Sequence, residues 1–227
     1  MLLPHRLLVL SPHLDDAVFA CGELIASSPG SAVATLFAGR PERCGPTAWD
    51  RDAGFADGDD VLGARRAEDQ AALRVLGAMP LWLEFADGQY GEPAPMHALA
   101  AALCGIIESE DADAVLFPAG LFHGDHRRTH DAALFVLDRF PDRQWLVYED
   151  ALYRRIDGLL DERLRLLDAI GLAPQRFRPP IEADARSRKR RAVGCYRSQL
   201  MALAIRRGHR DAFAPEGYWR IGARRTR

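Results

Sequence analysis

The sequence has little of what would mark a nucleic-acid-binding or membrane protein. Its 30 basic and 32 acidic residues give a formal net charge of −2, so no overall field favours nucleic acid or an anionic membrane surface as a partner. Lys189 is the single lysine, and arginine is enriched along the whole chain, so local arginine clusters carry little information. No hydrophobic run approaches the roughly 18 residues of a membrane span.

Cysteine pairs are also lacking. Cys21, Cys44, Cys104 and Cys195 lie far apart and form no C-x-x-C motif, which suits neither a zinc ribbon nor a disulfide framework. The apolar start, MLLPHRLLVLS, has no cationic leader and no small-residue cleavage site. We therefore expect reduced thiols and a soluble protein of the cytoplasm.

The pattern along the 227 residues predicts one domain, spanning residues 1–227, because no repeat, low-complexity segment or linker interrupts it. Short apolar runs alternate with segments of helical spacing, and residues 40–60 lack periodicity and predict a long loop. This order predicts an α/β fold, a Rossmann-like three-layer sandwich with a mostly parallel sheet. The expected strands are 7–10, 31–39, 81–88, 114–120 and 144–150, and the expected helices are 17–26, 62–77, 96–109, 128–140 and 185–207.

Two polar clusters follow predicted strands. His13, Asp15 and Asp16 lie in SPHLDD after the first strand, and FHGDHRRTH, residues 122–130, follows the fourth. Because ligands of open α/β sheets bind outside the carboxyl ends of the strands, we expect the two clusters to meet. Imidazole and carboxylate together suit a cation such as Zn²⁺ with one position left for water. Only one of two adjacent aspartates can easily reach the same ion, so the other is free to accept a proton from the water.

Each cluster also has a simpler interpretation. An aspartate of HLDD could cap the next helix, with His13 as an ordinary loop residue. The second cluster could be a polar helix start with exposed histidines. The joint placement of both at strand ends favours the metal site. His130 lies four residues after His126, which suits two ligands on one helix face, but Arg127 stands where a zincin has its glutamate, so we expect His130 beside the site or at the surface.

The motifs PHLDD and HGDH together resemble those of the PIG-L family of zinc-dependent N-deacetylases, also called LmbE-like proteins, whose usual forms are P-H-P-D-D and H-P-D-H. Similar segments at 65–77, 83–88 and 148–150 extend the resemblance over about residues 7–150, and residues 214–220 are similar to the family's closing segment. The resemblance implies zinc held by His13, Asp16 and His126. It also implies Asp15 as general base, and His123 as the group that stabilises the oxyanion and protonates the amine.

Three further roles and the substrate follow from the same resemblance. Asp125 would orient His123, and Arg65 and Asp87 would help to hold the sugar. The implied enzyme is a hydrolase that removes an acetyl group from an N-acetylated amino sugar or sugar-containing conjugate in a biosynthetic pathway, with no nucleic acid or membrane as partner. Whether the natural metal is Zn²⁺ or Fe²⁺ stays open.

The chain departs from the family motifs at three positions, none of them a proposed ligand. Leu14 and Gly124 replace the two prolines, and Ala17 replaces the common glutamate, as in a subgroup associated with biosynthetic pathways. These departures bear on the choice of substrate.

Two alternatives of function are weighed beside the deacetylase. One is a thiol-conjugate amidase of the same family. The other is a non-catalytic Rossmann-like binding module that uses the arginine-rich run 186–191 and the end ARRTR, residues 223–227, as an anion patch. A solvated helix face is the simpler interpretation of the run.

Overall fold

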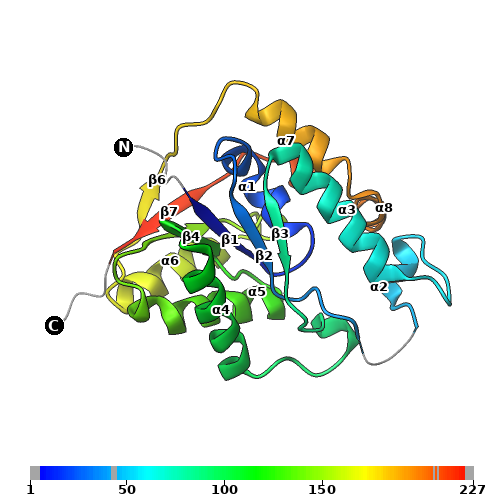
Figure 1. Cartoon of the computed structure of the whole chain (residues 1–227), viewed down its shortest axis with the longest axis horizontal. Coiled ribbons are helices and arrows are strands. Elements are labelled where there is room, and N and C mark those ends of the chain that lie inside the picture. The colour runs from blue at the N-terminus through cyan, green and yellow to red at the C-terminus, as the bar shows by residue number, and fades with distance from the viewer. Residues whose placement is uncertain (1–5, 42–44, 207, 209, 223–227) are drawn as a thin grey trace.

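A seven-stranded sheet forms the centre of the computed structural model, which describes residues 6–41, 45–206, 208 and 210–222 (Figure 1). The strand order is β3-β2-β1-β4-β5-β7-β6. The first five strands of that order are parallel, and β7 runs antiparallel to both of its neighbours. The strands are β1 (Leu7–Ser11), β2 (Ala32–Thr35), β3 (Met79–Trp82), β4 (Ala114–Pro118), β5 (Gln144–Tyr148), β6 (Gln175–Phe177) and β7 (Tyr218–Ile221).

Helices cover both faces of the sheet, as Figure 1 shows. The α-helices are α1 (Asp16–Ala26), α2 (Ala48–Asp52), α3 (Val61–Leu76), α4 (Met96–Glu110), α5 (Gly124–Val136), α6 (Leu159–Ala169), α7 (Ala185–Val193) and α8 (Arg197–Ile205). Short 3₁₀ turns are η1 (Gly88–Tyr90), η2 (Leu137–Arg139) and η3 (Asp211–Phe213). No helix in the described ranges is long and apolar enough to cross a membrane.

The alternation of side chains along β1 explains the two layers. Leu7 and Val9 pack with α1, α3 and α7 in one hydrophobic core, and Leu8 and Leu10 pack with α4, α5 and α6 in the other. Because successive strand side chains point to opposite faces, a continuous apolar strand must be covered on both sides. The expected α/β sandwich with a mostly parallel sheet is confirmed.

Two predicted segments differ from the structure near the pocket described below. The segment 40–60 was expected to be a loop, but it contains α2, whose start is fixed by a capping box between Thr47 and Asp50. The helix expected at 128–140 begins earlier, at Gly124, because Nδ1 of His123 accepts the backbone N–H of Asp125 and caps it. Both differences come from side-chain caps that hydrophobic spacing does not reveal.

The helix expected at 185–207 is two helices, with Arg207 outside the described residues. The break falls at residues 194–196, where Gly194 ends α7. The hydroxyl of Tyr196 donates to buried Asp69 at 2.7 Å, which holds the chain at the break. As a result α7 packs on α1 and α3, whereas α8 turns to pack on α2. The sequence analysis also missed α6, β6 and β7. The strand that it expected at 81–88 is β3, which begins two residues earlier and ends six residues earlier.

Candidate active site

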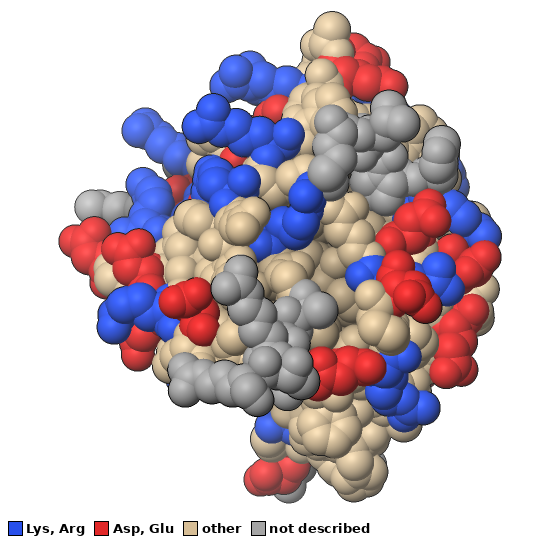
Figure 2. Space-filling model, turned by 90° about the vertical axis from the view of Figure 1, so that its left-hand side faces the viewer, with Lys and Arg blue, Asp and Glu red and all other residues tan. Residues whose placement is uncertain are grey.

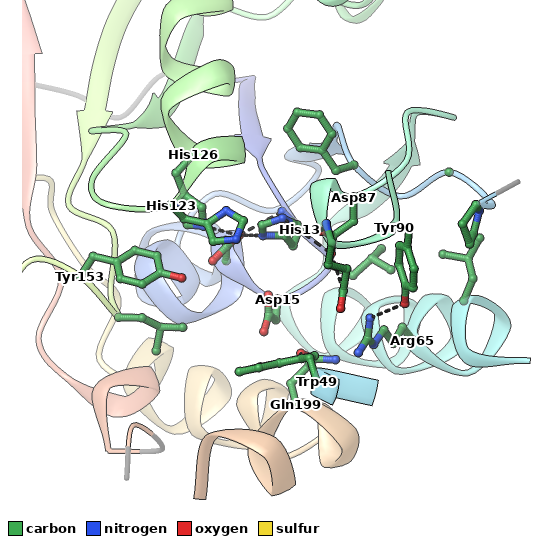
Figure 3. A pocket seen from close by; sticks show the side chains of 18 of the residues that line it. His13, Asp15, Trp49, Arg65, Asp87, Tyr90, His123, His126, Tyr153 and Gln199 are labelled. Carbon is green, nitrogen blue, oxygen red and sulfur yellow. Dashed lines mark hydrogen bonds and ion pairs between the residues drawn. The ribbon is translucent and has the colours of Figure 1, made fainter. Parts of the chain in front are cut away.

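The two motifs converge at the carboxyl ends of β1 and β4, as expected. They line one open pocket of about 340 Å³, together with residues that follow β5 and residues from α2, α3 and α8. Figure 3 shows His13, His123 and His126 at one side of this pocket and Trp49 and Gln199 at the other, with Asp15 between them. Sequence positions more than a hundred residues apart therefore share a single cavity.

Hydrogen bonds within residues 11–17 shape the first motif. Ser11 at the end of β1 donates its hydroxyl to the carbonyl of His13 at 2.6 Å and accepts the N–H of Ala17 at 3.0 Å. Oδ2 of Asp16 accepts the N–H of His13 at 2.9 Å. Asp15 precedes α1 but makes no side-chain cap. The capping interpretation of HLDD is therefore not observed, and the carboxylate of Asp15 faces the pocket.

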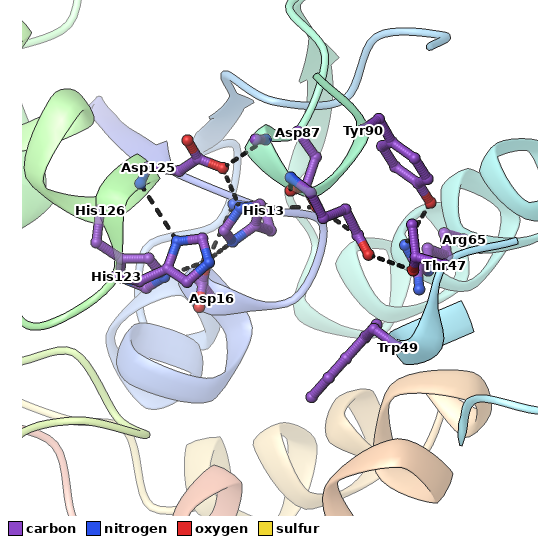
Figure 4. Close-up of polar contacts among 12 residues, drawn as sticks. His13, Asp16, Thr47, Trp49, Arg65, Asp87, Tyr90, His123, Asp125 and His126 are labelled. Atoms are coloured by element: carbon purple, nitrogen blue, oxygen red, sulfur yellow. Dashed lines mark hydrogen bonds and ion pairs between the residues drawn. The ribbon is translucent and has the colours of Figure 1, made fainter. Parts of the chain in front are cut away.

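Asp16 lies between two imidazoles. Its Oδ2 is 3.1 Å from Nδ1 of His13 and 3.1 Å from Nε2 of His126 (Figure 4). Asp16 and His126 are buried, and the His13 side chain is 20% exposed. The structure thus brings together the three side chains that the sequence analysis named as metal ligands, with one oxygen of Asp16 in contact with both imidazoles.

The outer nitrogen of each of these imidazoles meets a further carboxylate. Nε2 of His13 lies 3.0 Å from Oδ2 of Asp125, which also accepts the N–H of Gly88. Nδ1 of His126 makes a short hydrogen bond with Asp150, whose other oxygen accepts the N–H of Leu121. Metal-binding histidines characteristically donate their second N–H to such a partner, which fixes the tautomer and the ring orientation.

The expected role of Asp125 is not what its contacts show. Its carboxylate faces His13, and only its backbone N–H reaches His123, whose Nδ1 accepts it at 3.2 Å. The Asp125 carboxylate is buried and also accepts the N–H of Gly88 at 3.0 Å. Asp125 therefore orients His13 through its side chain and His123 through its main chain.

Asp125→Asn should accordingly weaken metal binding. An amide in place of the carboxylate removes a charged acceptor from His13, and changes of this kind cost about 10- to 100-fold in metal affinity. Competition with a chelator, followed by metal analysis, measures the loss. Asp131→Asn, on the same helix but exposed to solvent, is the control. Unchanged metal affinity together with reduced turnover would instead assign Asp125 to His123.

When no cation is present, charge interactions favour the ionised forms of the three predicted ligands. Burial by itself would lower the pKa of His126, but Asp16 and Asp150 raise it to about 9. Burial likewise opposes ionisation of His13, yet Asp87, Asp125 and Asp16 raise its pKa well above the usual range. A cation that binds Nδ1 of His13 and Nε2 of His126 must displace protons there, so metal binding should release protons.

His123 differs from the other two histidines. Burial, reinforced by His13 and His126, lowers its pKa, so the ring is neutral near pH 7. Because Nδ1 accepts a backbone N–H, the proton of the neutral ring is on Nε2. His123 lines the pocket and stacks on Tyr153 with an interplanar angle of 14°. Its chemistry is that of a neutral N–H donor, which can stabilise an oxyanion by a hydrogen bond.

Asp15 has the properties of a base. Burial and the neighbouring charge of Asp16 raise its pKa to about 7, and the described residues give its carboxylate no hydrogen bond. It lines the pocket beside the three predicted ligands. A carboxylate with a pKa near neutrality, free of partners and next to a cation site can take a proton from water.

Arg65 and Asp87, the two predicted sugar contacts, both line the pocket. Arg65 is held by the fully buried Asp50, at 2.7 Å, and by the hydroxyl of Tyr90, at 3.3 Å. Asp87 accepts the backbone and side-chain N–H groups of Gln89. The sequence analysis did not identify Asp50, which lies in α2 and holds the Arg65 guanidinium in place.

Three other residues were missed or misplaced. Asp150 has no role in the sequence analysis, although it is a polar residue at the end of a predicted strand, which is the signal that revealed His13. Tyr153, five residues after β5, lines the pocket beside His123. His130 is fully buried, and its Nδ1 bonds to the Pro118 carbonyl at 2.8 Å, so the surface position allowed for it is wrong.

Spacing alone also permits other metal ligand sets within the described residues. His13, His123 and His126 offer nitrogen atoms within 4.8 Å of one another, and His13, Asp87 and Asp125 form a second such group. His123 uses Nδ1 as a helix cap, and Asp87 and Asp125 are already bonded to N–H groups. Neither of these two groups includes Asp16, whose Oδ2 is also bonded to an N–H group, that of His13; the buried position of Asp16 between two imidazoles is the ground for the set named above.

A model of the PIG-L family, described as GlcNAc-PI de-N-acetylase, matches residues 8–137, which include both motifs. The chain belongs to the PIG-L family. It is 29% identical over 191 residues to the 2'-N-acetylparomamine deacetylase of Streptomyces fradiae, a match that covers 74% of this chain. The match spans only 65% of the length of that curated relative.

Two solved structures are similar over nearly the whole PIG-L chain. A triple mutant of a deacetylase of the teicoplanin biosynthetic pathway has a TM-score of 0.75 and 28% identity, with 95% of this chain and 97% of that one covered. The A40926 pseudoaglycone deacetylase Dbv21 also has a TM-score of 0.75, with 26% identity and 98% and 99% coverage. The similarity therefore extends well beyond residue 150, where the sequence motifs stop.

The departures from the PIG-L motifs leave the site intact. Leu14 is buried and lines the pocket, and Ala17 donates its N–H to Ser11 within the first turn of α1. Gly124 begins α5 without a left-handed backbone conformation. Neither missing proline is needed for the two loops to meet.

The arginine-rich run 186–191 is partly structural. Arg188 donates to the carbonyls of Ala26 and Leu76, the C-terminal ends of α1 and α3, at 2.8 and 2.7 Å. Lys189 is 2% exposed and pairs with Glu216 at 2.7 Å. Figure 2 shows basic side chains gathered on one part of the surface with acidic groups close by. The solvated-face interpretation is wrong for these two residues, and the segment 223–227 lies outside the described residues.

Proposed function

We propose that this PIG-L chain is a zinc-dependent N-deacetylase that hydrolyses the acetamide of an N-acetylated amino sugar within a larger conjugate. The relatives named above are deacetylases, one of the teicoplanin biosynthetic pathway and one of the pseudoaglycone of the antimicrobial reagent A40926. The observation that carries the proposal is Oδ2 of Asp16 lying 3.1 Å from one nitrogen of His13 and 3.1 Å from one of His126, in a pocket that Asp15 also lines without a side-chain hydrogen bond to the described residues.

The donor set fits zinc. Two imidazole nitrogens and one carboxylate oxygen are a ligand combination of catalytic zinc sites, which leave a fourth position open. The outer nitrogens of both rings already bond to Asp125 and Asp150, as expected of metal-binding histidines. A zinc ion there would act as a Lewis acid that polarises the amide carbonyl and acidifies the attacking water.

The residues of the chain divide the proton transfers. The carboxylate of Asp15 takes a proton from the attacking water as the water oxygen adds to the acetyl carbon. Nε2–H of His123 donates to the developing oxyanion, a contribution of about 3 to 4 kcal/mol for one preorganised donor. Asp15, which now carries the proton of the water, gives it to the amine nitrogen as the C–N bond breaks and acetate leaves. Arg65 and Asp87, each held in place by neighbours, are the proposed sugar contacts.

Tyr153 is proposed as a second donor. Its ring lies edge-on to His126 and stacks on His123, and the described residues give its hydroxyl no hydrogen bond. In Figure 3 the hydroxyl points into the pocket towards the histidines and Asp15. Burial, with Asp16 and Asp15 nearby, raises the pKa of this phenol, so it stays protonated and can donate to the substrate carbonyl or its oxyanion.

Tyr153→Phe should therefore lower kcat by about tenfold to a hundredfold. The variant keeps the ring contacts with His123 and His126, so metal content and thermal stability should match those of the wild type. Tyr90→Phe is the contrast. It removes a hydroxyl that bonds to Asp50 and to Arg65, a proposed sugar contact, so it should act mainly on KM. A Tyr153→Phe enzyme with unchanged kcat would remove the phenol from the reaction.

Acetate release tests the proposed function. Purified protein is analysed for zinc and iron, and acetate is then measured over a panel of N-acetylhexosamine derivatives and cysteinyl amides. Metal-dependent acetate release from the sugar derivatives is expected. Cleavage of cysteinyl amides alone would identify a thiol-conjugate amidase, and metal-free protein that retains DNA on a filter would favour the non-catalytic binding module.

A location in the cytoplasm stays a prediction.

A further inference from the structure

The wall of the pocket opposite the histidines is formed by Trp49 of α2, together with Gln199 of α8 and Arg206 at the end of α8. Nε1 of Trp49 donates to Oε1 of Gln199 at 3.0 Å, and the guanidinium of Arg206 lies 4.9 Å from the centre of the indole ring. All three side chains line the pocket. Figure 3 shows the indole nearly edge-on, with Gln199 and the orange helix α8 on one side and Asp15 and the histidines on the other.

The indole is fixed before any ligand arrives. The capping box at Thr47 sets the start of α2, the hydrogen bond to Gln199 sets the orientation of the ring, and Arg206 holds α2 to α8 through its 2.8 Å ion pair with Asp52. A rigid aromatic plate on one wall of a cavity is suited to stacking, because little side-chain entropy is lost when a ring packs on it. Nothing in the proposed hydrolysis requires such a plate.

The charged residues that line the pocket limit which chemical groups can stack on Trp49. Among the described lining residues, Arg65 and Arg206 are the basic side chains other than histidine, and both are paired with carboxylates, Asp50 and Asp52. Asp15, Asp16 and Asp87 line the pocket without an arginine or lysine partner. A phosphate on the substrate would therefore face these carboxylates, and the described lining residues offer it no arginine or lysine that is free of a carboxylate partner.

We infer that Trp49 forms a subsite for a second ring attached to the N-acetylated sugar, and that this ring system is neutral or cationic and carries no phosphate. The inference rests on the proposed function and narrows its substrate class. The sugar lies between the histidines and Arg65, and the attached ring stacks on the indole. Either an aromatic aglycone or the apolar face of another sugar has the required chemistry.

Binding in an inactive background tests the subsite without turnover. The protein is the full chain with Asp15→Asn, loaded with zinc, and the probes are the methyl glycoside, phenyl glycoside, hexosyl disaccharide and 1-phosphate of N-acetylglucosamine. Calorimetry should give a phenyl or hexosyl Kd about tenfold below that of the methyl glycoside. The 1-phosphate should bind more weakly than the methyl glycoside. Whichever ring compound binds more tightly identifies the source of the ring.

Trp49→Leu should abolish this preference, and Trp82→Leu is the matched control. Trp82 also donates its indole N–H to a side chain, Asp69, and lies under an arginine, Arg66, but it does not line the pocket. Trp49→Phe, which keeps a ring, should retain most of the preference and covers the case in which Trp49→Leu does not fold. The inference is overturned if the preference survives Trp49→Leu, is equally lost in Trp82→Leu, or if the phosphate binds most tightly.

Acetate release by the wild-type protein separates the two proposals. Ring-dependent binding without acetate release from any probe contradicts the deacetylase and leaves the subsite supported. Acetate release with equal affinity for methyl, phenyl and hexosyl compounds supports the deacetylase and contradicts the subsite. Neither binding nor release contradicts both.

Discussion

Asp15→Asn should lower kcat for acetate release about a thousandfold while the protein keeps its zinc. General base catalysis contributes about 10²- to 10⁴-fold, and Asp15 is the carboxylate of the pocket that has a raised pKa, near 7, and no hydrogen-bond partner among the described residues. The substitution preserves shape and removes only the proton acceptor. Turnover under saturating substrate and zinc content per chain are the two measurements.

The adjacent aspartate provides the contrast. Asp16→Asn should lose zinc as well as turnover, because Oδ2 of Asp16 is the atom shared by His13 and His126. The pH profile is a further check on Asp15. In the wild type kcat/KM should rise with pH through an apparent pKa at or below about 7, because a raised carboxyl pKa must be exceeded for the base to work and a nearby cation lowers it again. Near-normal activity of Asp15→Asn would show that the base has been wrongly assigned.

His13→Ala should abolish zinc binding and turnover together. It removes one of two imidazole donors and leaves the carboxylates of Asp16 and Asp125 facing an empty space. Zinc content after dialysis against a weak chelator is the measurement. Proton release on adding zinc to the wild type, absent in the variant, is an independent readout, since His13 must give up a proton to bind.

Substitutions of two other histidines serve as comparisons for His13→Ala. His123→Ala should keep zinc and lose about a hundredfold in kcat, because its Nδ1 caps α5 and only Nε2 faces the reaction. His97→Ala, on the exposed side of α4, should change neither quantity. Loss of zinc in His123→Ala would instead favour the three-histidine ligand set.

The sequence predicted which motif residues meet at the strand ends, but it did not predict how α2 and α8 line the rest of the pocket. His13 and His126 follow two strands of strong apolar pattern, and the rule that parallel strands end at one edge of the sheet was enough to bring them together. The same rule applied to residues 144–150 would have found Asp150. It could not show that the Asp125 side chain turns to His13, because that depends on the N–H of Gly88 in a distant loop.

The missed elements share a physical cause. β6 is the edge strand and has only three residues, two of them exposed, and β7 runs antiparallel between β5 and β6, so neither has the apolar run of a buried parallel strand. Trp49 and Gln199 are 150 positions apart, and their hydrogen bond depends on the break at Gly194 that turns α8 towards α2. Hydrophobic spacing reports which face of an element is buried, and it does not report where two short helices cross.

Anomalous diffraction at the zinc edge, from crystals of the zinc-loaded chain, tests the central claim most directly. We predict a single ion within about 2.0 to 2.2 Å of Nδ1 of His13, Oδ2 of Asp16 and Nε2 of His126, with the carboxylate of Asp15 near it but not bound. An ion held by His123 in place of Asp16, or one that lies between Asp87 and Asp125, would contradict the account.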